Sequence, residues 1–437
     1  MKKTILTIIL ILTSIIIFAQ ESELEDIKIK YEFYYKASNI KMGILLKRDS
    51  TYFKVRLNFP KNNENNVFNI ASATKTFTAV LVLQEIEKGN LKLTDSIGKY
   101  LSPIDNVSSN ITIEQLLRHQ TGLAEVVGDQ KWDVYNIPQD SLLRRDIFRN
   151  VPPRNIDKIG KFEYANINYI LLGEILEKIN DKSYFDLLEE QIFEPCKMEN
   201  TYPYISKNIP RLIHPTDEKN EKDRYNGINY KFFANYCFSA GSIASTLDDM
   251  AKFYENLFEK EILINKNSLK KMTDFKEGNY GLGLQIFNID EIEYYGHGGN
   301  NYGYSFRIYY NPKNGNMILY FTNRFRVPFK NSLLEDLSAV MNKKLIREFR
   351  KNITNEFKHF KGTYILEGPN LEFSIFERDN LLYFQVKNLK VPLVSYEPNI
   401  LSDVTSGINF TKSKDKPNQI IWNQNGQKII ANKTNRN

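Results

Sequence analysis

The chain is poor in the residues that build disulfide-stapled or zinc-stabilised proteins. Its 437 residues include only two cysteines, Cys196 and Cys237, and four histidines. Neither cysteine has a metal-ligand companion, and no His-x-x-x-His or His-Glu-x-x-His spacing occurs, so we expect no metal site and no cofactor. Two isolated cysteines in a chain of this size are more often separate buried residues, and a disulfide stays open as the alternative.

The chain also lacks a concentrated block of charge. It carries 59 Lys and Arg against 52 Asp and Glu, a net charge of +7, spread along its length. Proteins that bind nucleic acid through surface charge gather that charge in a patch or stripe, so we expect no nucleic-acid partner. Hydrophobic residues make up 42% of the sequence, which is enough for large cores and excludes a disordered chain.

Only one segment is apolar over a long stretch, and it lies at the N-terminus. A Met-Lys-Lys start precedes a nearly unbroken apolar run over Ile5–Phe18, and Ala19 ends it. The run has about 14 residues, short of the ~20 that a membrane-spanning helix needs. The pattern predicts a signal peptide over residues 1–19 and an exported protein, periplasmic or extracellular, with no stable membrane span after cleavage. An uncleaved membrane anchor is the alternative.

The order of expected elements favours an α+β fold over residues 20–350. An N-terminal hairpin is expected at Lys41–Lys47 and Thr51–Leu57, and a helical subdomain with long loops over about 90–235. Strands, helices, strands and a final helix in this order predict an antiparallel sheet with flanking helices. Helices are expected at Lys75–Lys88, Ile113–Arg118, Tyr169–Ile179, Tyr184–Ile192, Leu247–Phe258 and 332–350. The later strands are expected at Gly281–Ile286, Glu291–Tyr295, Phe306–Tyr310 and Met317–Phe321.

The composition changes near residue 355. From there to the C-terminus, short alternating strands are separated by polar turns, and no helical period of useful length occurs. The segment 355–437 is therefore predicted to be a small all-β domain of about 80 residues, a plausible autonomous size. Its strands are expected at Phe360–Leu366, Leu371–Glu377, Leu381–Val386 and Ile420–Asn423.

The pattern Ser-x-x-Lys, which occurs five times, suggests covalent chemistry. On a helix it puts a hydroxyl and an amine one turn apart on one face, and a lysine whose pKa is lowered by burial can activate the hydroxyl. Only Ser72 begins a long helix with a defined apolar face, so Ser72 and Lys75 are the candidate nucleophile and base. The alternative is that Ser72 only caps the helix. The other pairs are Ser38/Lys41, Ser96/Lys99, Ser268/Lys271 and Ser413/Lys416.

A second segment, Phe162–Asn166, contains Tyr-x-Asn. This spacing places the Tyr164 phenol and the Asn166 amide on the same side of an extended segment. A phenol can shuttle a proton, and an amide can orient a lysine and bind a substrate amide. The alternative is a core tyrosine followed by a capping asparagine.

A third segment, Tyr295–Asn300, follows a predicted strand and surrounds His297 with glycines. Glycines let backbone N–H groups approach a ligand closely, as an oxyanion hole requires. The alternative is a glycine-rich hairpin turn in which the histidine is incidental.

The segment Phe68–Ala79 reads Phe-Asn-Ile-Ala-Ser-Ala-Thr-Lys-Thr-Phe-Thr-Ala, and the three motifs follow in the order Ser-x-x-Lys, Tyr-x-Asn and His-x-Gly. Over roughly residues 30–345 the chain thereby resembles the serine β-lactamase and penicillin-binding protein superfamily, specifically the class C β-lactamase-like serine hydrolases. These include D-alanyl-D-alanine carboxypeptidases, D-amino-acid peptidases and esterases. Further matching landmarks are Ile111–Leu123, Tyr164–Gly173, Ile192–Pro195, Ala240–Thr246 and Tyr280–Leu284.

The resemblance implies roles for the first two motifs. Ser72 would be the acylated nucleophile and Lys75 its general base or the group that tunes it. Tyr164 would relay protons to the leaving group and from the deacylating water. Asn166 would hold Lys75 and bind the substrate amide.

For the third motif, the resemblance implies that His297 is catalytic and that Gly299 and Asn300 bind substrate. The backbone N–H groups of Ser72 and Asn300 would form the oxyanion hole. His297 stands where β-lactamases usually carry lysine, and a permanently charged lysine suits a substrate carboxylate better. The histidine therefore favours the peptidase and esterase branches. The C-terminal part resembles the small β-barrel-like domains appended to some members.

The sequence thus predicts an exported serine acyl-hydrolase with a small-molecule or peptide substrate. The candidates are D-Ala-D-Ala cell-wall peptides, other D-amino-acid peptides, small esters and β-lactams. A dedicated β-lactamase is one alternative, and a non-catalytic cell-wall binding or sensor protein that keeps the fold is another. No Gly-x-Ser-x-Gly occurs, which disfavours an α/β-hydrolase. The loops Val126–Asn155 and Pro203–Asn235 are expected to set specificity.

Overall fold

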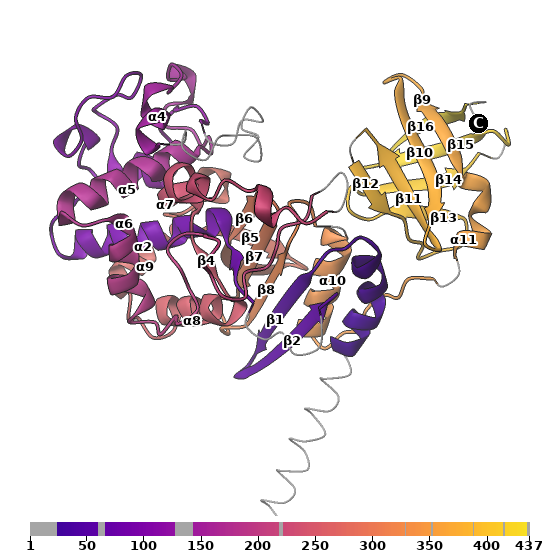
Figure 1. Cartoon of the computed structure of the whole chain (residues 1–437), viewed down its shortest axis with the longest axis horizontal. Coiled ribbons are helices and arrows are strands. Elements are labelled where there is room, and N and C mark those ends of the chain that lie inside the picture. Colours follow the sequence, from indigo (N-terminus) through magenta and orange to yellow (C-terminus); the bar gives the residue numbers. More distant parts are fainter. Residues whose placement is uncertain are drawn as a thin grey trace, which may run out of the picture.

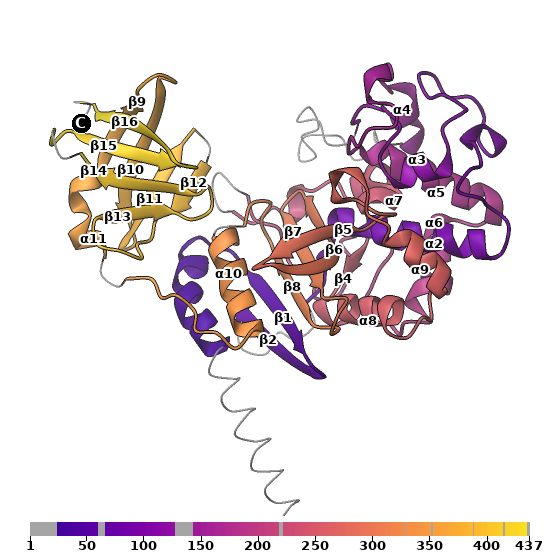
Figure 2. The same ribbon diagram turned by 180° about the vertical axis from the view of Figure 1, so that it is seen from behind.

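Two antiparallel sheets, one of six strands and one of eight, organise the computed structural model (Figures 1 and 2). The predicted signal peptide lies outside the described residues. Within the described ranges, no helix is both long and apolar enough to cross a membrane. The structure describes residues 24–59, 66–126, 143–217, 222–327, 329–350, 353–387, 389–413 and 416–434.

In the six-stranded sheet, strands from the beginning and from the end of the first domain pair with each other. Its strand order is β2-β1-β8-β7-β6-β5. The predicted hairpin is present, and its first strand pairs with the last strand of the sheet, Met42 lying opposite Thr322. The helical segments between β2 and β5 are therefore an insertion into the sheet. The strands are β1 Met42–Arg48, β2 Thr51–Leu57, β5 Gln285–Ile289, β6 Ile292–Asn301, β7 Tyr304–Tyr310 and β8 Met317–Thr322.

Helices cover both faces of this sheet, and each face has its own core. On β1, Leu45 belongs to one core while Ile44 and Leu46 belong to the other, because side chains alternate between faces along a strand. A helix over residues 24–37 and α10 (Lys330–Met341) pack on the Ile44 side, and α2 (Thr74–Glu87) and α8 (Leu247–Phe258) on the Leu45 side.

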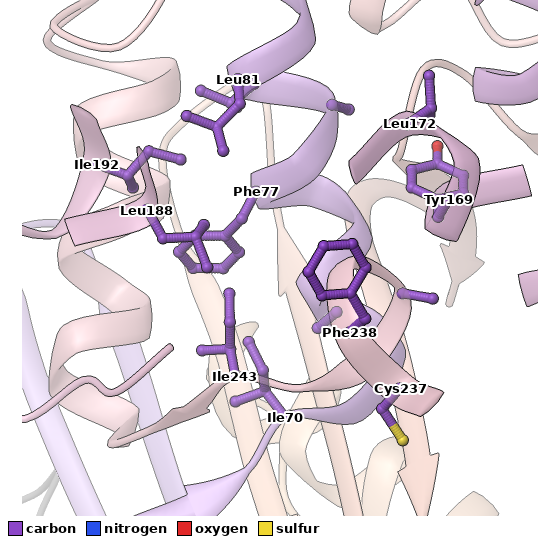
Figure 3. Packing of buried hydrophobic residues seen from close by; sticks show 14 of the residues in the cluster. Ile70, Phe77, Leu81, Tyr169, Leu172, Leu188, Ile192, Cys237, Phe238 and Ile243 are labelled. Carbon is purple, nitrogen blue, oxygen red and sulfur yellow. The ribbon is translucent and has the colours of Figure 1, made fainter. Parts of the chain in front are cut away.

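The helical insertion packs around α2. Figure 3 shows Phe77 of α2 close to Leu188 and Ile243, and the Phe77 ring stacks on Phe253 at 3.7 Å between centroids. A two-stranded sheet of β3 and β4 leads into the Ser72 segment. The remaining elements used below are α3 Ile113–Leu117, α4 Arg144–Arg149, α5 Asn166–Asn180, α6 Tyr184–Leu188, α7 Phe238–Gly241, α9 Lys266–Met272, β3 Phe68–Asn69 and β4 Ala244–Ser245.

The structure corrects three predicted boundaries. The strand predicted at Gly281–Ile286 begins only at Gln285, since the Leu282 N–H bonds to Met272 and Gly283 has a φ of 73°. The helix predicted over 332–350 ends at Met341, and the following residues pack along helix 24–37 instead. The strand predicted to end at Tyr295 continues to Asn301, because all its residues from Tyr295 onward pair with β7.

The C-terminal sheet is a nearly closed barrel. Its strand order is β12-β11-β10-β9-β16-β15-β14-β13, and a bridge between Val394 and Ser402 links its two ends. The sequence indicated four of these strands and missed β12, β13, β14 and β16, which are short or polar. The strands are β9 Gly362–Leu366, β10 Leu371–Arg378, β11 Leu381–Val386, β12 Leu389–Pro392, β13 Ile400–Asp403, β14 Ile408–Lys412, β15 Gln419–Gln424 and β16 Gln427–Lys433.

The barrel contacts the first domain on the side of helix 24–37 and α10 (Figure 2). The Phe349 ring lies between Tyr34 and Tyr396, at 5.6 and 5.2 Å between centroids. The Arg350 N–H donates to the Ser395 carbonyl at 2.8 Å. The predicted α+β fold with a C-terminal all-β part is confirmed.

Candidate active site

Ser72 lies in a short 3-10 turn, Ala71–Ala73, immediately before α2. The predicted helix over Lys75–Lys88 is observed as Thr74–Glu87, and its N-cap is Ala73, without a side-chain hydrogen bond, so Ser72 lies just before the helix and the capping alternative is wrong. Ala71 adopts a φ of 48°, a conformation that costs about 1–2 kcal/mol for a residue with a Cβ. The Asn69 amide supports this turn, because its Oδ1 accepts from the Ala71 N–H at 3.2 Å. Ser72 itself is half-buried.

Lys75 is fully buried one turn further along. Its Nζ donates to Asn166 Oδ1 at 2.6 Å and to the Ala240 carbonyl at 2.7 Å. Burial lowers the pKa of Lys75 to about 7, against the opposing effect of the Glu125 carboxylate and of Cys237. An amine with this pKa is neutral in a large fraction of molecules near pH 7, and can accept a proton.

Tyr164 lies beside Ser72 and Lys75. The Lys75 Nζ lies 4.9 Å from the centre of the Tyr164 ring, and the Ser72 side chain lies near enough to lower the pKa of the phenol. Burial raises the pKa of Tyr164 above its ordinary value, although the nearby Ser72 side chain opposes this. The phenol is therefore protonated at neutral pH, and it can pass a proton on while Lys75 is the stronger candidate base.

Asn166 is the first residue of α5 and is not a cap, since the N-cap is Ala165. Its backbone N–H and its Nδ2 both donate to Glu125 Oε2, at 2.9 and 3.0 Å. Sequence reasoning missed Glu125, because nothing in its local pattern distinguishes it from a surface carboxylate.

His297 lies within β6, and not after a strand as predicted, nor in the hairpin turn of the alternative interpretation. The residue is buried, with Nδ1 2.6 Å from the Gly298 carbonyl and Nε2 2.9 Å from the Tyr280 hydroxyl. A carbonyl only accepts, so this pattern assigns the hydrogen to Nδ1, and Tyr280 donates to Nε2. Burial lowers the pKa of His297 to about 3, and the nearby Lys75 adds to this effect. The imidazole is therefore neutral and supplies no positive charge.

Two further residues around the site were not singled out from the sequence. Tyr280 and His119 both fall within landmark segments of the family, which is the signal that could have found them. The His119 ring lies 4.3 Å from the Tyr164 ring and 4.9 Å from the Tyr280 ring, between centroids. Its Nδ1 accepts from the Ala165 N–H at 3.2 Å. These aromatic contacts hold Tyr164 in place.

Gly299 faces the turn that carries the nucleophile. A Cβ at this position would lie 2.0 Å from the Ile70 carbonyl oxygen and 2.9 Å from the Ser72 nitrogen. Only glycine lets β6 approach the Ser72 backbone so closely.

The edge of β6 is open beside Gly299. The pairing of β5 with β6 stops at Gln285 opposite Gly296, and the Gly298 N–H on that edge reaches only the Gln285 side chain, at 3.4 Å. Strand alternation puts the Asn300 N–H on the same edge. The Asn300 side chain points elsewhere, because its Oδ1 accepts from Ser305 and Arg307 at 2.7 and 3.0 Å. Asn300 can therefore contribute its backbone N–H and not its amide.

The structure thus brings together every residue that the sequence suggested for the site. Cys196 and Cys237 are both free and buried, so the disulfide alternative is not realised. Part of the first predicted specificity loop, residues 127–142, lies outside the described residues.

A half-buried serine, a buried lysine, a tyrosine and an open strand edge together are typical of a class of acyl-transferring proteins. The chain belongs to the beta-lactamase family, whose sequence model matches residues 47–340. Penicillin-binding protein 4* of Bacillus subtilis (strain 168) is 22% identical over 405 residues, covering 85% of this chain and 88% of that protein. Teichoic acid D-alanine hydrolase of Staphylococcus aureus is 26% identical over 265 residues, covering 58% of this chain and 61% of that protein.

Solved structures agree on the fold. An octameric penicillin-binding protein homologue from Pyrococcus abyssi superposes with a TM-score of 0.61 at 19% identity, covering 95% of this chain and 99% of that one. D-amino acid amidase from Ochrobactrum anthropi SV3 gives a TM-score of 0.62 at 20% identity, covering 73% of this chain and 99% of that one. The second match leaves out about a quarter of this chain.

Proposed function

We propose that the protein is an exported serine acyl-hydrolase that forms an acyl-enzyme on Ser72. The observation that carries the proposal is the buried Lys75, held by two hydrogen bonds with a pKa of about 7 next to a serine that is half-buried and reachable. The Tyr164 phenol, which lies close enough to Ser72 for the serine to lower its pKa, disfavours the alternative of a non-catalytic protein that keeps only the fold.

In the proposed acylation step, the neutral Lys75 takes the proton of Ser72, and the Ser72 Oγ attacks the substrate carbonyl carbon. The electron pair of the carbonyl bond moves to its oxygen, which accepts hydrogen bonds from the backbone N–H groups of Ser72 and Asn300. The tetrahedral intermediate collapses, and the leaving group departs with a proton relayed through Tyr164. Water then attacks the acyl carbon while its proton passes through Tyr164 to Lys75. The bond between the acyl carbon and the Ser72 Oγ breaks, and Lys75 returns the proton to this oxygen, which releases the acid and regenerates Ser72.

The proposed substrates are D-alanyl-D-alanine peptides, other D-amino-acid peptides or small esters. The relatives named after penicillin binding, D-alanine hydrolysis and D-amino acid amides support this group. His297 is neutral, and in the described part of the site Lys75 is committed to Asn166 and Ala240. A free substrate carboxylate therefore gains little charge stabilisation from these two groups, which favours esters and amides without such a carboxylate over β-lactams and over D-alanyl-D-alanine peptides alike. A β-lactamase remains the second candidate, because β-lactams acylate the same kind of serine.

Labelling and hydrolysis together test the proposal. A fluorescent penicillin and a fluorophosphonate should label the wild type and Ser268→Ala, and should not label Ser72→Ala. Ser268 has the same Ser-x-x-Lys spacing on α9, so it is a matched control. Hydrolysis of p-nitrophenyl acetate, a D-Ala-D-Ala peptide and nitrocefin by these proteins ranks the substrates. Equal turnover by the wild type and folded Ser72→Ala would overturn the proposal.

A further inference from the structure

We propose that Glu125 is a positioning residue for acylation, which fixes the orientation of the Asn166 amide and so keeps the lone pair of Lys75 available to the Ser72 proton. The proposal rests on the proposed acyl-hydrolase function. It concerns a residue that acts on Lys75 through Asn166.

The first step is the geometry at Glu125. A single carboxylate oxygen, Oε2, accepts from the Asn166 backbone N–H at 2.9 Å and from Asn166 Nδ2 at 3.0 Å. An amide has nearly the same shape when its oxygen and nitrogen exchange places. The carboxylate removes this ambiguity, because only the NH₂ group can donate to it. The Asn166 Oδ1 must then face Lys75, as observed at 2.6 Å.

The second step concerns the hydrogens of Lys75. A neutral amine has two N–H groups and one lone pair. The two acceptors at Lys75, Asn166 Oδ1 and the Ala240 carbonyl, use both N–H groups. The lone pair then points away from them, free to accept a proton. With the Asn166 amide reversed, Nδ2 would donate to Lys75 and consume the lone pair that the base needs.

The third step is electrostatic. The titratable groups that act on Lys75 or share its surroundings are Glu125, Cys237, His119, His297, Tyr164 and Tyr169. Burial lowers the pKa of both histidines and raises the pKa of Cys237 and of both tyrosines, so these five groups are neutral at pH 7. Of the two groups in this set that raise the pKa of Lys75, Glu125 and Cys237, the Glu125 carboxylate has the larger effect.

Two substitutions separate the charge of Glu125 from its geometry. In Glu125→Gln, the amide oxygen can still accept both Asn166 donors, so we expect kcat/KM for p-nitrophenyl acetate to stay within about tenfold. The acidic limb of the pH profile of kcat/KM should move to lower pH by about one unit, because the negative charge of Glu125 is gone. In Glu125→Ala, the acceptor is lost as well, and kcat should fall about 100-fold with KM little changed. Glu114→Gln removes a carboxylate that pairs with Arg118, and it should match the wild type in rate and in pH profile.

A titration that needs no turnover makes the test independent of the proposed reaction. The pKa of Lys75, measured by NMR of ¹³Cε-labelled lysine in Ser72→Ala, should be lower when Glu125→Gln is added and unchanged when Glu114→Gln is added. An unchanged Lys75 pKa, together with a wild-type rate for folded Glu125→Ala, would overturn the positioning role. Failure of Ser72 labelling in the wild type would instead overturn the proposed function.

Discussion

The two sheets of this protein bury different kinds of group. The barrel is filled by Phe373, Phe384, Phe410 and Trp422, whose ring centroids lie 5.2–5.8 Å apart. The helical face of the six-stranded sheet buries an amine and two imidazoles that water would solvate better. An aromatic core stabilises the fold through the area it removes from water, whereas buried ionisable groups cost stability and mark a site where chemistry is proposed.

The polar groups of the two regions also find partners differently. In the barrel, the buried Asp403 accepts from the N–H groups of Thr405 and Ser406 in its own turn. In the catalytic domain, Lys75 bonds to Asn166, 91 residues away, and to Ala240, 165 residues away. Local pairs form wherever the turn forms, while the lysine site exists only when several distant segments are folded together.

The largest expected effect on activity comes from Lys75→Met, which removes the buried amine. General-base catalysis contributes about 10²–10⁴-fold, so kcat/KM for p-nitrophenyl acetate should fall by this amount. The wild-type rate should rise with pH around a midpoint near 7, because only the neutral amine accepts a proton. Lys271→Met, on the surface of α9, should leave rate and pH profile unchanged. A wild-type kcat/KM in Lys75→Met would show that the buried amine of the first domain, like the aromatic core of the barrel, is not needed for chemistry.

The same substitution makes a prediction about stability. The folded-state pKa of Lys75 lies below the unfolded value of 10.5, so the unfolded chain binds more protons between about 7 and 10.5. The loss of folding stability caused by burying Lys75 is complete below pH 7 and disappears as pH rises toward 10.5. The gain in melting temperature of Lys75→Met over the wild type should therefore be larger at pH 6 than at pH 10. A pH-independent difference would contradict this assignment.

A smaller effect is expected from Gly299→Ala. The added Cβ would lie 2.0 Å from the Ile70 carbonyl oxygen, so β6 must move away from the Ser72 backbone. Loss of oxyanion geometry should cost about 10²–10³-fold in kcat. Gly89→Ala is the control, because its Cβ meets nothing within 4 Å and its φ of 80° adds only strain. It should lower stability by about 1–2 kcal/mol without changing kcat.

The smallest expected effect on activity comes from a substitution in the barrel. Phe384→Ala removes a fully buried ring and should cost about 3–5 kcal/mol of unfolding free energy. The hydrolysis rate, divided by the amount of protein that fluorophosphonate labels, should equal that of the wild type. Ile430→Ala, at a half-exposed position of β16, should change stability by less than about 0.5 kcal/mol. A parallel loss of kcat in folded Phe384→Ala would show that the barrel shapes the site.

The site motifs could be predicted from the sequence because each is compact and differs from its look-alikes. Ser72 was separated from four other Ser-x-x-Lys pairs by the apolar face of α2, and the structure places Lys75 in that helix, fully buried. The position of His297 within β6 could not be predicted, because three glycines among four consecutive residues are typical of a turn. Pairing with β7 overrides that local preference.

Other features depended on contacts that no local pattern contains. Glu125 is distinguished only by the two N–H groups of Asn166 that reach it, 41 residues later in the chain. The end of α10 at Met341 depends on the chain turning to place Phe349 against Tyr31 and Tyr34. The missed barrel strands are four to seven residues long, and their partners in the sheet define them.

The pairing of β1 with β8 also sets the time at which the first domain can form during synthesis. Met42 pairs with Thr322, so the central strand pair closes only after about 280 further residues have been made. At about 5–20 residues per second, a ribosome takes tens of seconds to supply them. Until then the N-terminal hairpin has no neighbour on one edge, and contacts of such long sequence separation form slowly. The nascent chain therefore lacks its central strand pair until nearly the whole first domain has been synthesised.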